Sequence, residues 1–236
     1  RADVLAATGT PLFVYDLDLV VQKIRRFRRA FPNIHLHYAI KANSYRQLLS
    51  YVAGRVDGLD IASGGELNLA LEAGADPATI SFAGPGKRDE ELEKAIRAGV
   101  TLNCESEGEA ERALEIADRS GQILKIAVRV NPDFEIKGSG MRMGGGAKPF
   151  GIDAERVPAL VYRLLEAGAD WLGFHIFAGS QALDAKALID AQRATVELAA
   201  RLAHDIGVRP SLVNLGGGFG IPYFYGRGPL HVEAGG

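Results

Sequence analysis

Leu124-Lys125-Ile126-Ala127-Val128-Arg129-Val130, residues 124–130, is the stretch that decides the fold class. Ile126, Val128 and Val130 are apolar, whereas the residue between the last two is Arg129. Side chains on a strand point alternately to its two faces, so one face here is apolar and the other carries a charge. An open parallel sheet covered by helices should be apolar on both faces. The alternation therefore favours a closed barrel, with polar groups on its inner face.

Six further stretches show the same alternation. With residues 124–130, they predict seven strands, the others being 35–41, 57–62, 80–83, 100–104, 171–176 and 212–216. Helical patterns lie between them, which is typical of parallel strands joined by crossover helices. Near their C-terminal ends, six of these strands carry a polar residue on the inner face: Lys41, Asp60, Ser81, Arg129, His175 and Asn214. The C-terminal mouth of such a barrel is where catalysis occurs, so we expect these residues to converge on one site.

The chain divides into three predicted segments. Residues 1–31 should form an early strand at 12–15 and a helix that begins at Asp16 or Asp18; residues 32–224 should form the barrel; and residues 225–236 read as a loop tail with nothing after it to pack against. A parallel barrel must close, because an unpaired edge leaves unsatisfied donors and acceptors. We therefore expect an α/β, TIM-type (β/α)8 barrel that is truncated before its eighth strand.

Composition excludes several classes of function. The net charge is −2, and no stripe of lysine and arginine accompanies exposed aromatic residues, so we expect no nucleic-acid partner. The single cysteine, Cys104, rules out an intrachain disulfide and fits a reducing compartment. No apolar run is long enough to cross a bilayer, so we expect a cytoplasmic protein without a membrane partner. Burial in the core is the expected role of Cys104.

Lys41 ends the first barrel strand, in Tyr38-Ala39-Ile40-Lys41-Ala42-Asn43. A lysine that points into a barrel mouth is costly to bury charged and readily loses its proton. A neutral amine can form a Schiff base with an aldehyde cofactor or a carbonyl substrate. The alternative is a structural lysine that pairs with an inner carboxylate.

A glycine-rich loop, Leu215-Gly216-Gly217-Gly218-Phe219-Gly220, follows the seventh strand. Consecutive glycines let backbone N–H groups surround an anion, and phosphate sites in these barrels form after strands seven and eight. His175 could lie against a planar heterocycle, or it could be an ordinary core residue. The hydroxyl of Ser180 could reach the same phosphate as the glycines.

Arg129 is directed inward and keeps its charge, so it needs an anionic partner. Asp60, Glu66 or an oxygen of a cofactor could supply it.

Five motifs follow one another along the chain: Tyr38-Ala39-Ile40-Lys41-Ala42-Asn43, Asp60-Ile61-Ala62-Ser63-Gly64-Gly65-Glu66, Arg129-Val130-Asn131-Pro132, His175 with Gly179-Ser180-Gln181, and Gly216-Gly217-Gly218-Phe219-Gly220. Together they resemble the decarboxylases of the diaminopimelate, ornithine and arginine decarboxylase group, which depend on pyridoxal 5′-phosphate (PLP). These enzymes share the alanine-racemase-like barrel of fold type III. The resemblance points to the diaminopimelate decarboxylase-like branch, which includes members associated with exopolysaccharide systems.

The resemblance implies a role for each motif. Lys41 and His175 would be catalytic, the first as the Schiff-base lysine and the second stacked on the pyridine ring. The implied cofactor-binding residues are Lys41, Asp60, Glu66, Arg129, His175, Ser180, Gly216, Gly217 and Gly218, and no metal is implied. The resemblance also implies a small amino acid as substrate, diaminopimelate or a related basic amino acid, and a homodimer.

Two departures from the family pattern accompany the resemblance. Ile176, Phe177 and Ala178 separate His175 from the glycine and serine that usually follow almost at once. Residues 135–148 replace a loop of different composition and are a candidate gate for the mouth. The partner of the pyridine nitrogen, the proton donor and the C-terminal β domain should lie outside this chain, so we do not expect the chain alone to be active.

Three alternatives stay open: an amino-acid racemase on the same barrel, a non-catalytic PLP-binding homologue, and a cofactor-free Schiff-base aldolase.

Overall fold

The computed structural model describes residues 2–132, 134, 141–142, 149–226 and 228–235. Seven strands form the main path of its eight-stranded sheet: β1 (His37–Ala39), β2 (Gly58–Ile61), β3 (Ile80–Phe82), β4 (Thr101–Cys104), β5 (Lys125–Asn131), β8 (Asp170–Ile176) and β10 (Leu212–Asn214). The α-helices are α1 (Ala2–Thr8), α2 (Leu17–Ala30), α3 (Arg46–Ala53), α4 (Gly64–Glu72), α5 (Asp89–Ala98), α6 (Glu107–Ser120), α7 (Val157–Glu166) and α8 (Ala185–Ile206). Short 3-10 helices are η1 (Ile40–Ala42), η2 (Pro77–Thr79), η3 (Ala154–Arg156) and η4 (Val232–Gly235).

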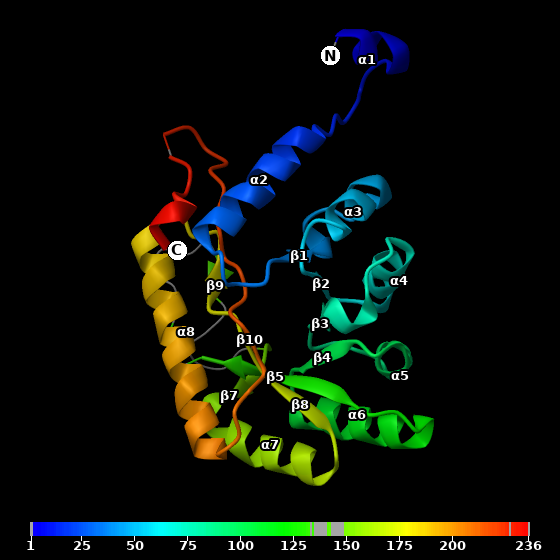
Figure 1. Cartoon of the computed structure of the whole chain (residues 1–236), viewed down its shortest axis with the longest axis vertical. Coiled ribbons are helices and arrows are strands. Elements are labelled where there is room, and N and C mark those ends of the chain that lie inside the picture. The colour runs from blue at the N-terminus through cyan, green and yellow to red at the C-terminus, as the bar shows by residue number, and fades with distance from the viewer. Residues whose placement is uncertain (1, 133, 135–140, 143–148, 227, 236) are drawn as a thin grey trace.

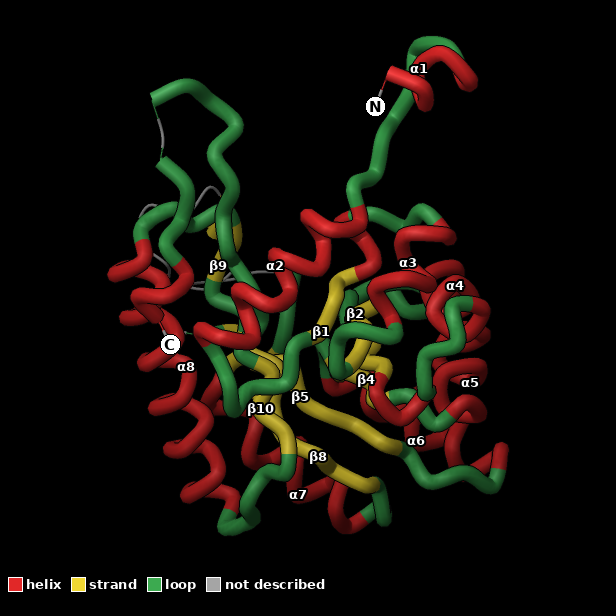
Figure 2. The backbone as a smooth tube through the Cα atoms, turned by 45° about the horizontal axis from the view of Figure 1, so that its top comes forward, coloured by secondary structure: helices red, strands yellow, loops and turns green. Residues whose placement is uncertain are grey.

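The sheet is parallel throughout its main path. Its order is β1-β2-β3-β4-β5-β8-β10, so each main strand lies beside the one that precedes it in the chain. The short strand β7 (Ile152–Asp153) also pairs with β5, and β6 (Met141–Arg142) pairs with β9 (Gly179–Ser180) in a separate antiparallel ribbon. The strands lie inside a curved wall of helices (Figures 1 and 2). The predicted α/β barrel of seven strands, incomplete before an eighth, is confirmed.

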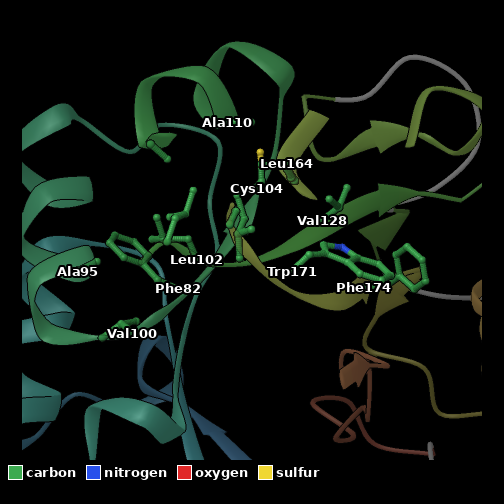
Figure 3. Packing of buried hydrophobic residues seen from close by; sticks show 14 of the residues in the cluster. Phe82, Ala95, Val100, Leu102, Cys104, Ala110, Val128, Leu164, Trp171 and Phe174 are labelled. Carbon is green, nitrogen blue, oxygen red and sulfur yellow. The ribbon is translucent and has the colours of Figure 1, made fainter. Parts of the chain in front are cut away.

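The apolar faces of the main strands from β2 to β8 pack against the helices, as their alternation predicted, whereas Val213 of β10, predicted to face the helices, is 38% exposed. Phe82, Leu102, Val128 and Phe174 are fully or almost fully buried there, and Figure 3 shows them in one continuous core. Trp171 meets Phe174 edge to face, with ring centroids 5.3 Å apart. Burial of this apolar surface is the main force that holds helices and sheet together.

The helices begin and end where local chemistry favours it. Ser63 precedes α4 and accepts a hydrogen bond from Glu66 N, and Ser106 precedes α6 and accepts one from Glu109 N. Such caps satisfy N–H groups that have no partner within the helix. Gly99 ends α5 in the left-handed conformation, with φ +79°, which a residue without a Cβ adopts at low cost.

The N-terminal strand predicted at residues 12–15 is wrong. These residues form an extended connection without a sheet partner, and Phe13 is 89% exposed. Their β-branched and aromatic side chains favour a strand only when a neighbouring strand is available. Helix α2 begins at Leu17, with Asp16 as its cap, close to the predicted start. Helix α1 was not predicted and lies apart from the other helices in Figure 1.

The tail is more ordered than a loop. Leu230 and Val232 are buried beside Ala30 of α2 and Leu188 of α8, and the end of the described chain lies beside both helices in Figure 1. The Arg26 guanidinium donates to both carboxylate oxygens of Glu233, at 2.5 and 2.7 Å. Of the predicted gate at residues 135–148, only Met141 and Arg142 are among the described residues. Within the described chain, every helix is too short or too polar to cross a lipid bilayer.

Candidate functional site

Lys41 lies at the C-terminal edge of the sheet, in the 3-10 turn η1 that follows β1. It is exposed, so the expectation that the barrel mouth buries it is wrong for the described chain. The turn is closed by Asn43 N, which donates to Ile40 O at 3.1 Å. The Tyr38 hydroxyl donates to Asn43 O at 3.0 Å, and burial raises the pKa of Tyr38. The amine of Lys41 is therefore presented to solvent from a turn that is anchored at both ends.

His175 lies beside Arg129, because the two residues are register partners on the neighbouring strands β8 and β5. His175 is buried, and its Nδ1 has no hydrogen-bond partner among the described residues. Its pKa is lowered to about 3, first by burial and then by the charge of Arg129. Asp60 opposes this shift and Lys41 adds to it, so Arg129, Asp60 and Lys41 all lie within electrostatic range of His175. The imidazole is neutral at pH 7.

The partner of Arg129 is neither Asp60 nor Glu66, which corrects those two expectations. Arg129 Nη1 donates to Glu105 Oε1 at 2.6 Å, and both side chains are buried. The register pairs Cys104 with Val128, so the next residue of each chain segment, Glu105 and Arg129, also come together. Glu105 was not predicted as a site residue, because the register between neighbouring strands is not visible in the sequence.

Asp60 and Glu66 make other contacts instead. Asp60 Oδ1 lies 3.1 Å from His37 Nδ1, across the pairing of β1 with β2. Glu66 Oε2 accepts a hydrogen bond from Ala62 N at 2.7 Å, which ties the first turn of α4 to the end of β2. Both carboxylates remain at the sheet edge that carries Lys41.

The glycine loop lies beside the segment that follows Ser180. Ala182 N donates to Gly218 O at 2.9 Å, and Gly220 N donates to Ala182 O at 2.8 Å. Gly216 N donates to Asn214 Oδ1 at 2.8 Å, which sets the bend at the end of β10. The structure thus brings the two predicted phosphate-binding segments side by side.

Phe177, predicted only to separate His175 from Gly179 and Ser180, packs against the glycine loop. A Cβ added at Gly216 would lie 2.5 Å from Phe177 Cδ2, and Gly216 has φ +68°, so glycine is required there on two grounds. A Cβ added at Gly217 would meet nothing within 4 Å. The glycine loop is therefore packed against the Phe177 ring at Gly216 and has open space beside Gly217.

A second buried ion pair lies near the mouth and was also missed. Lys87 Nζ donates to Glu109 Oε1 at 2.7 Å and to the carbonyl oxygens of Gly84 and Asn103 at 2.7 and 2.9 Å. Asn103 Nδ2 in turn donates to Ser81 Oγ at 2.6 Å. A lysine in a loop and a glutamate on a helix are usually exposed to solvent, so these residue types did not predict a buried ion pair.

Cys104 is buried, as expected, and burial raises its pKa to about 12. A thiol with this pKa is a poor nucleophile at neutral pH. Within the described chain, no three His, Cys, Asp or Glu side chains gather in a way that could bind a metal ion.

Residues 17–235 match the family model for the pyridoxal binding domain of pyridoxal-dependent decarboxylases. The chain belongs to this family. The match spans the whole sheet and the candidate site, so pyridoxal phosphate is the cofactor to which the residues of the mouth must be fitted.

Relatives of this pyridoxal-dependent decarboxylase domain include an L-glutamyl-[BtrI acyl-carrier protein] decarboxylase from Niallia circulans, 33% identical over 95% of this chain and 54% of the relative. A diaminopimelate decarboxylase from Aquifex aeolicus is 36% identical over 91% of this chain and 52% of the relative. The chain thus spans about half the length of the curated relatives it matches.

A solved diaminopimelate decarboxylase from Helicobacter pylori, complexed with L-lysine, matches the whole domain. Its TM-score is 0.89 at 29% identity, with 100% of this chain and 61% of the solved chain covered. An arginine decarboxylase from Paramecium bursaria Chlorella virus, bound to agmatine, has the same fold, with a TM-score of 0.75 at 22% identity.

Proposed function

We propose that this chain is the cofactor-binding part of a PLP-dependent amino-acid decarboxylase, a carboxy-lyase, in which Lys41 carries the cofactor as a Schiff base. The observation that carries the proposal is the arrangement at one edge of the sheet. An exposed amine at Lys41, a neutral imidazole at His175 and a glycine loop from Gly216 to Gly218 all lie at the C-terminal ends of strands. The family match makes PLP the molecule that such a set would hold.

The residues present fit this cofactor. The open space at Gly217 leaves room for the phosphate, with Gly216, Gly218 and Ser180 around it. His175 Nδ1 lacks a partner among the described residues. Because the His175 ring is neutral, the charge of Arg129 does not repel it, and the ring can lie against the pyridine ring. Asp60, Glu66 and Arg129 would surround the ring and the lysine. When bound, PLP supplies an electron sink for the bond that breaks at the α-carbon.

The proposed reaction is loss of CO₂ from a free or carrier-linked amino acid. Diaminopimelate or a related basic amino acid is the first candidate, because several relatives bear that name. The relative from Niallia circulans, named for an L-glutamyl group on a carrier protein, makes an acidic substrate the second. We further propose that the protein acts as a homodimer, as the resemblance to the family implies.

Borohydride trapping tests the Schiff-base assignment. The protein is incubated with PLP, reduced with borohydride, digested, and analysed for a pyridoxyl group on the peptide that contains Lys41. We expect the label in wild type and in Lys94→Arg, an exposed lysine on α5 that serves as the control. Lys41→Ala should carry no label and should lose the absorbance of the bound cofactor. A Lys41→Ala protein that is still labelled contradicts the assignment.

Isotope experiments separate the alternatives. The assay uses the full-length protein, because this chain alone is not expected to be active. Amino acids labelled at the α-carboxyl group should then release labelled CO₂ if the protein is a decarboxylase. A racemase would instead exchange the α-hydrogen with deuterated water without releasing CO₂. A non-catalytic homologue would bind PLP and do neither, and a cofactor-free aldolase would show no absorbance from bound PLP.

A further inference from the structure

Glu105 is a buried carboxylate at the C-terminal end of β4, and it connects three segments of the mouth. Its Oε1 accepts hydrogen bonds from Arg129 Nη1 at 2.6 Å and from Gly84 N at 2.5 Å. Its Oε2 accepts one from Gly151 N at 3.0 Å. Gly84 belongs to the loop after β3, Arg129 to β5 and Gly151 to the connection before β7. One side chain thus fixes an inner cation and two loops.

Because both side chains are buried, Arg129 needs the negative charge of Glu105 beside it. The side chain of Glu105 is 1% exposed and that of Arg129 is 8% exposed. A buried guanidinium without a counter-charge is strongly unfavourable, and it binds any anion that it can reach. The Arg129 guanidinium also lies over the Phe150 ring, 4.9 Å from its centroid, so Phe150 provides a second contact that holds the guanidinium in place. Glu105 therefore sets both the position and the net charge of the Arg129 group.

Arg129 is in turn a neighbour of His175, its register partner on β8. The charge of Arg129 acts directly on the His175 imidazole. A displacement of the guanidinium changes the electrostatic environment of the surface against which the proposed cofactor ring would lie. Glu105 touches neither Lys41 nor the glycine loop in the contacts of the described chain, so it can act on the cofactor through Arg129 or through the loops at Gly84 and Gly151 that it also holds.

We propose that Glu105 is a positioning residue that holds the Arg129 guanidinium in place and charge-balanced for binding of the cofactor. The inference rests on the proposed function, because it assumes that PLP occupies the mouth. It is distinct from a merely structural role, in which Glu105 would only join the loops at Gly84 and Gly151.

Titration with PLP, followed by absorbance, tests the inference in Glu105→Gln, Arg129→Gln and the double variant. Glu105→Gln should weaken PLP binding about tenfold, and Arg129→Gln should weaken it by a similar factor. In the Arg129→Gln background, Glu105→Gln should cause no further loss, because the group through which it acts is gone. Chemical denaturation of the same proteins reports the structural contribution of the two backbone contacts separately.

Glu109→Gln is the matched control. Glu109 is the other buried carboxylate of this region, and its partner is Lys87 rather than Arg129. We expect Glu109→Gln to lower stability yet change PLP binding less than twofold. Equal weakening by Glu109→Gln and Glu105→Gln would show a general loss of packing and would overturn the inference. So would full additivity of Glu105→Gln with Arg129→Gln, or unchanged PLP binding in Glu105→Gln.

Glu105→Asp serves if Glu105→Gln does not fold. This variant keeps the charge but withdraws the carboxylate by one methylene group. We expect severalfold weaker PLP binding and a shifted absorption maximum of the bound cofactor, and no change in either would overturn the inference. Failure of wild type to bind PLP would instead contradict the proposed function itself, so the two failures are distinguishable.

Discussion

Lys87 Nζ and Glu109 Oε1 lie 2.7 Å apart, and their side chains are 1% and 3% exposed. The pair connects the loop after β3 to helix α6 inside the protein. Burial raises the pKa of Glu109 even though Lys87 opposes the shift. Each charge is tolerated only because the other is present.

Lys87→Met should therefore destabilise the protein by roughly 3–5 kcal/mol at pH 8, because it leaves Glu109 buried and unpaired. Without Lys87, the pKa of Glu109 rises further above its unfolded value. Stability from the protonated carboxyl is then present at low pH and is lost as the pH rises through that pKa. The deficit relative to wild type should be smaller at pH 5 than at pH 8, as urea denaturation can measure.

The double variant Lys87→Met/Glu109→Leu provides the comparison. Replacing both charges by apolar groups should recover most of the lost stability, since a buried pair is often matched by good apolar packing. A double variant no more stable than Lys87→Met would contradict this account.

Gly216→Ala should lower the free energy of unfolding by about 1–3 kcal/mol, because it combines a left-handed φ of +68° with a contact of 2.5 Å to the Phe177 ring. Gly217→Ala should change it by less than about 0.5 kcal/mol, since its methyl group would enter open space. Denaturant unfolding of the two variants gives the comparison. Equal effects of the two substitutions would argue against the described course of the loop.

The neutral His175 should make the protein sensitive to acid. Its folded pKa is about 3 against an unfolded value of 6.5, so the unfolded state binds the proton between these limits. Stability should fall as the pH falls from 6.5 towards 3, by at most about 1.4 kcal/mol per pH unit from this group. His175→Gln should flatten the profile, whereas His204→Gln, at an exposed position on α8, should leave it unchanged. A His175→Gln profile identical to wild type would refute the assignment.

Cys104 should not react with thiol reagents in the folded protein. It is 1% exposed and its pKa is about 12, so almost no thiolate forms at pH 8. Labelling with a chromogenic disulfide should follow unfolding in urea and should be complete only in the denatured protein. Rapid labelling of the native protein at pH 8 would show that this part of the core is open.

The strands were predictable because their signal is local. Alternation of apolar and polar residues is a property of four to seven consecutive positions, and all seven main strands lie where it predicts them. The convergence of Lys41, Asp60, Arg129 and His175 followed from strand direction alone.

The partners of those residues could not be predicted, since they depend on register across the sheet. Arg129 pairs with Glu105, the residue that follows the adjacent strand β4, whereas Asp60 lies on β2, with β3 and β4 in between. The roles of Phe177 and Lys87 depend on the paths of loops, which no periodicity encodes. The false strand at residues 12–15 had suitable side chains but no neighbour to pair with.

The two parts of the candidate site, Lys41 and the glycine loop, lie at opposite edges of the sheet. Lys41 comes after β1 and the glycine loop after β10, the first and last strands of the order, and no ladder of hydrogen bonds joins these two strands in the described chain. The distance between the Lys41 amine and the glycine loop is therefore the distance within the site that backbone hydrogen bonds constrain least. A molecule bound covalently after β1 and through its phosphate after β10 would link the two edges of the sheet. Its binding would then make the curved sheet more rigid.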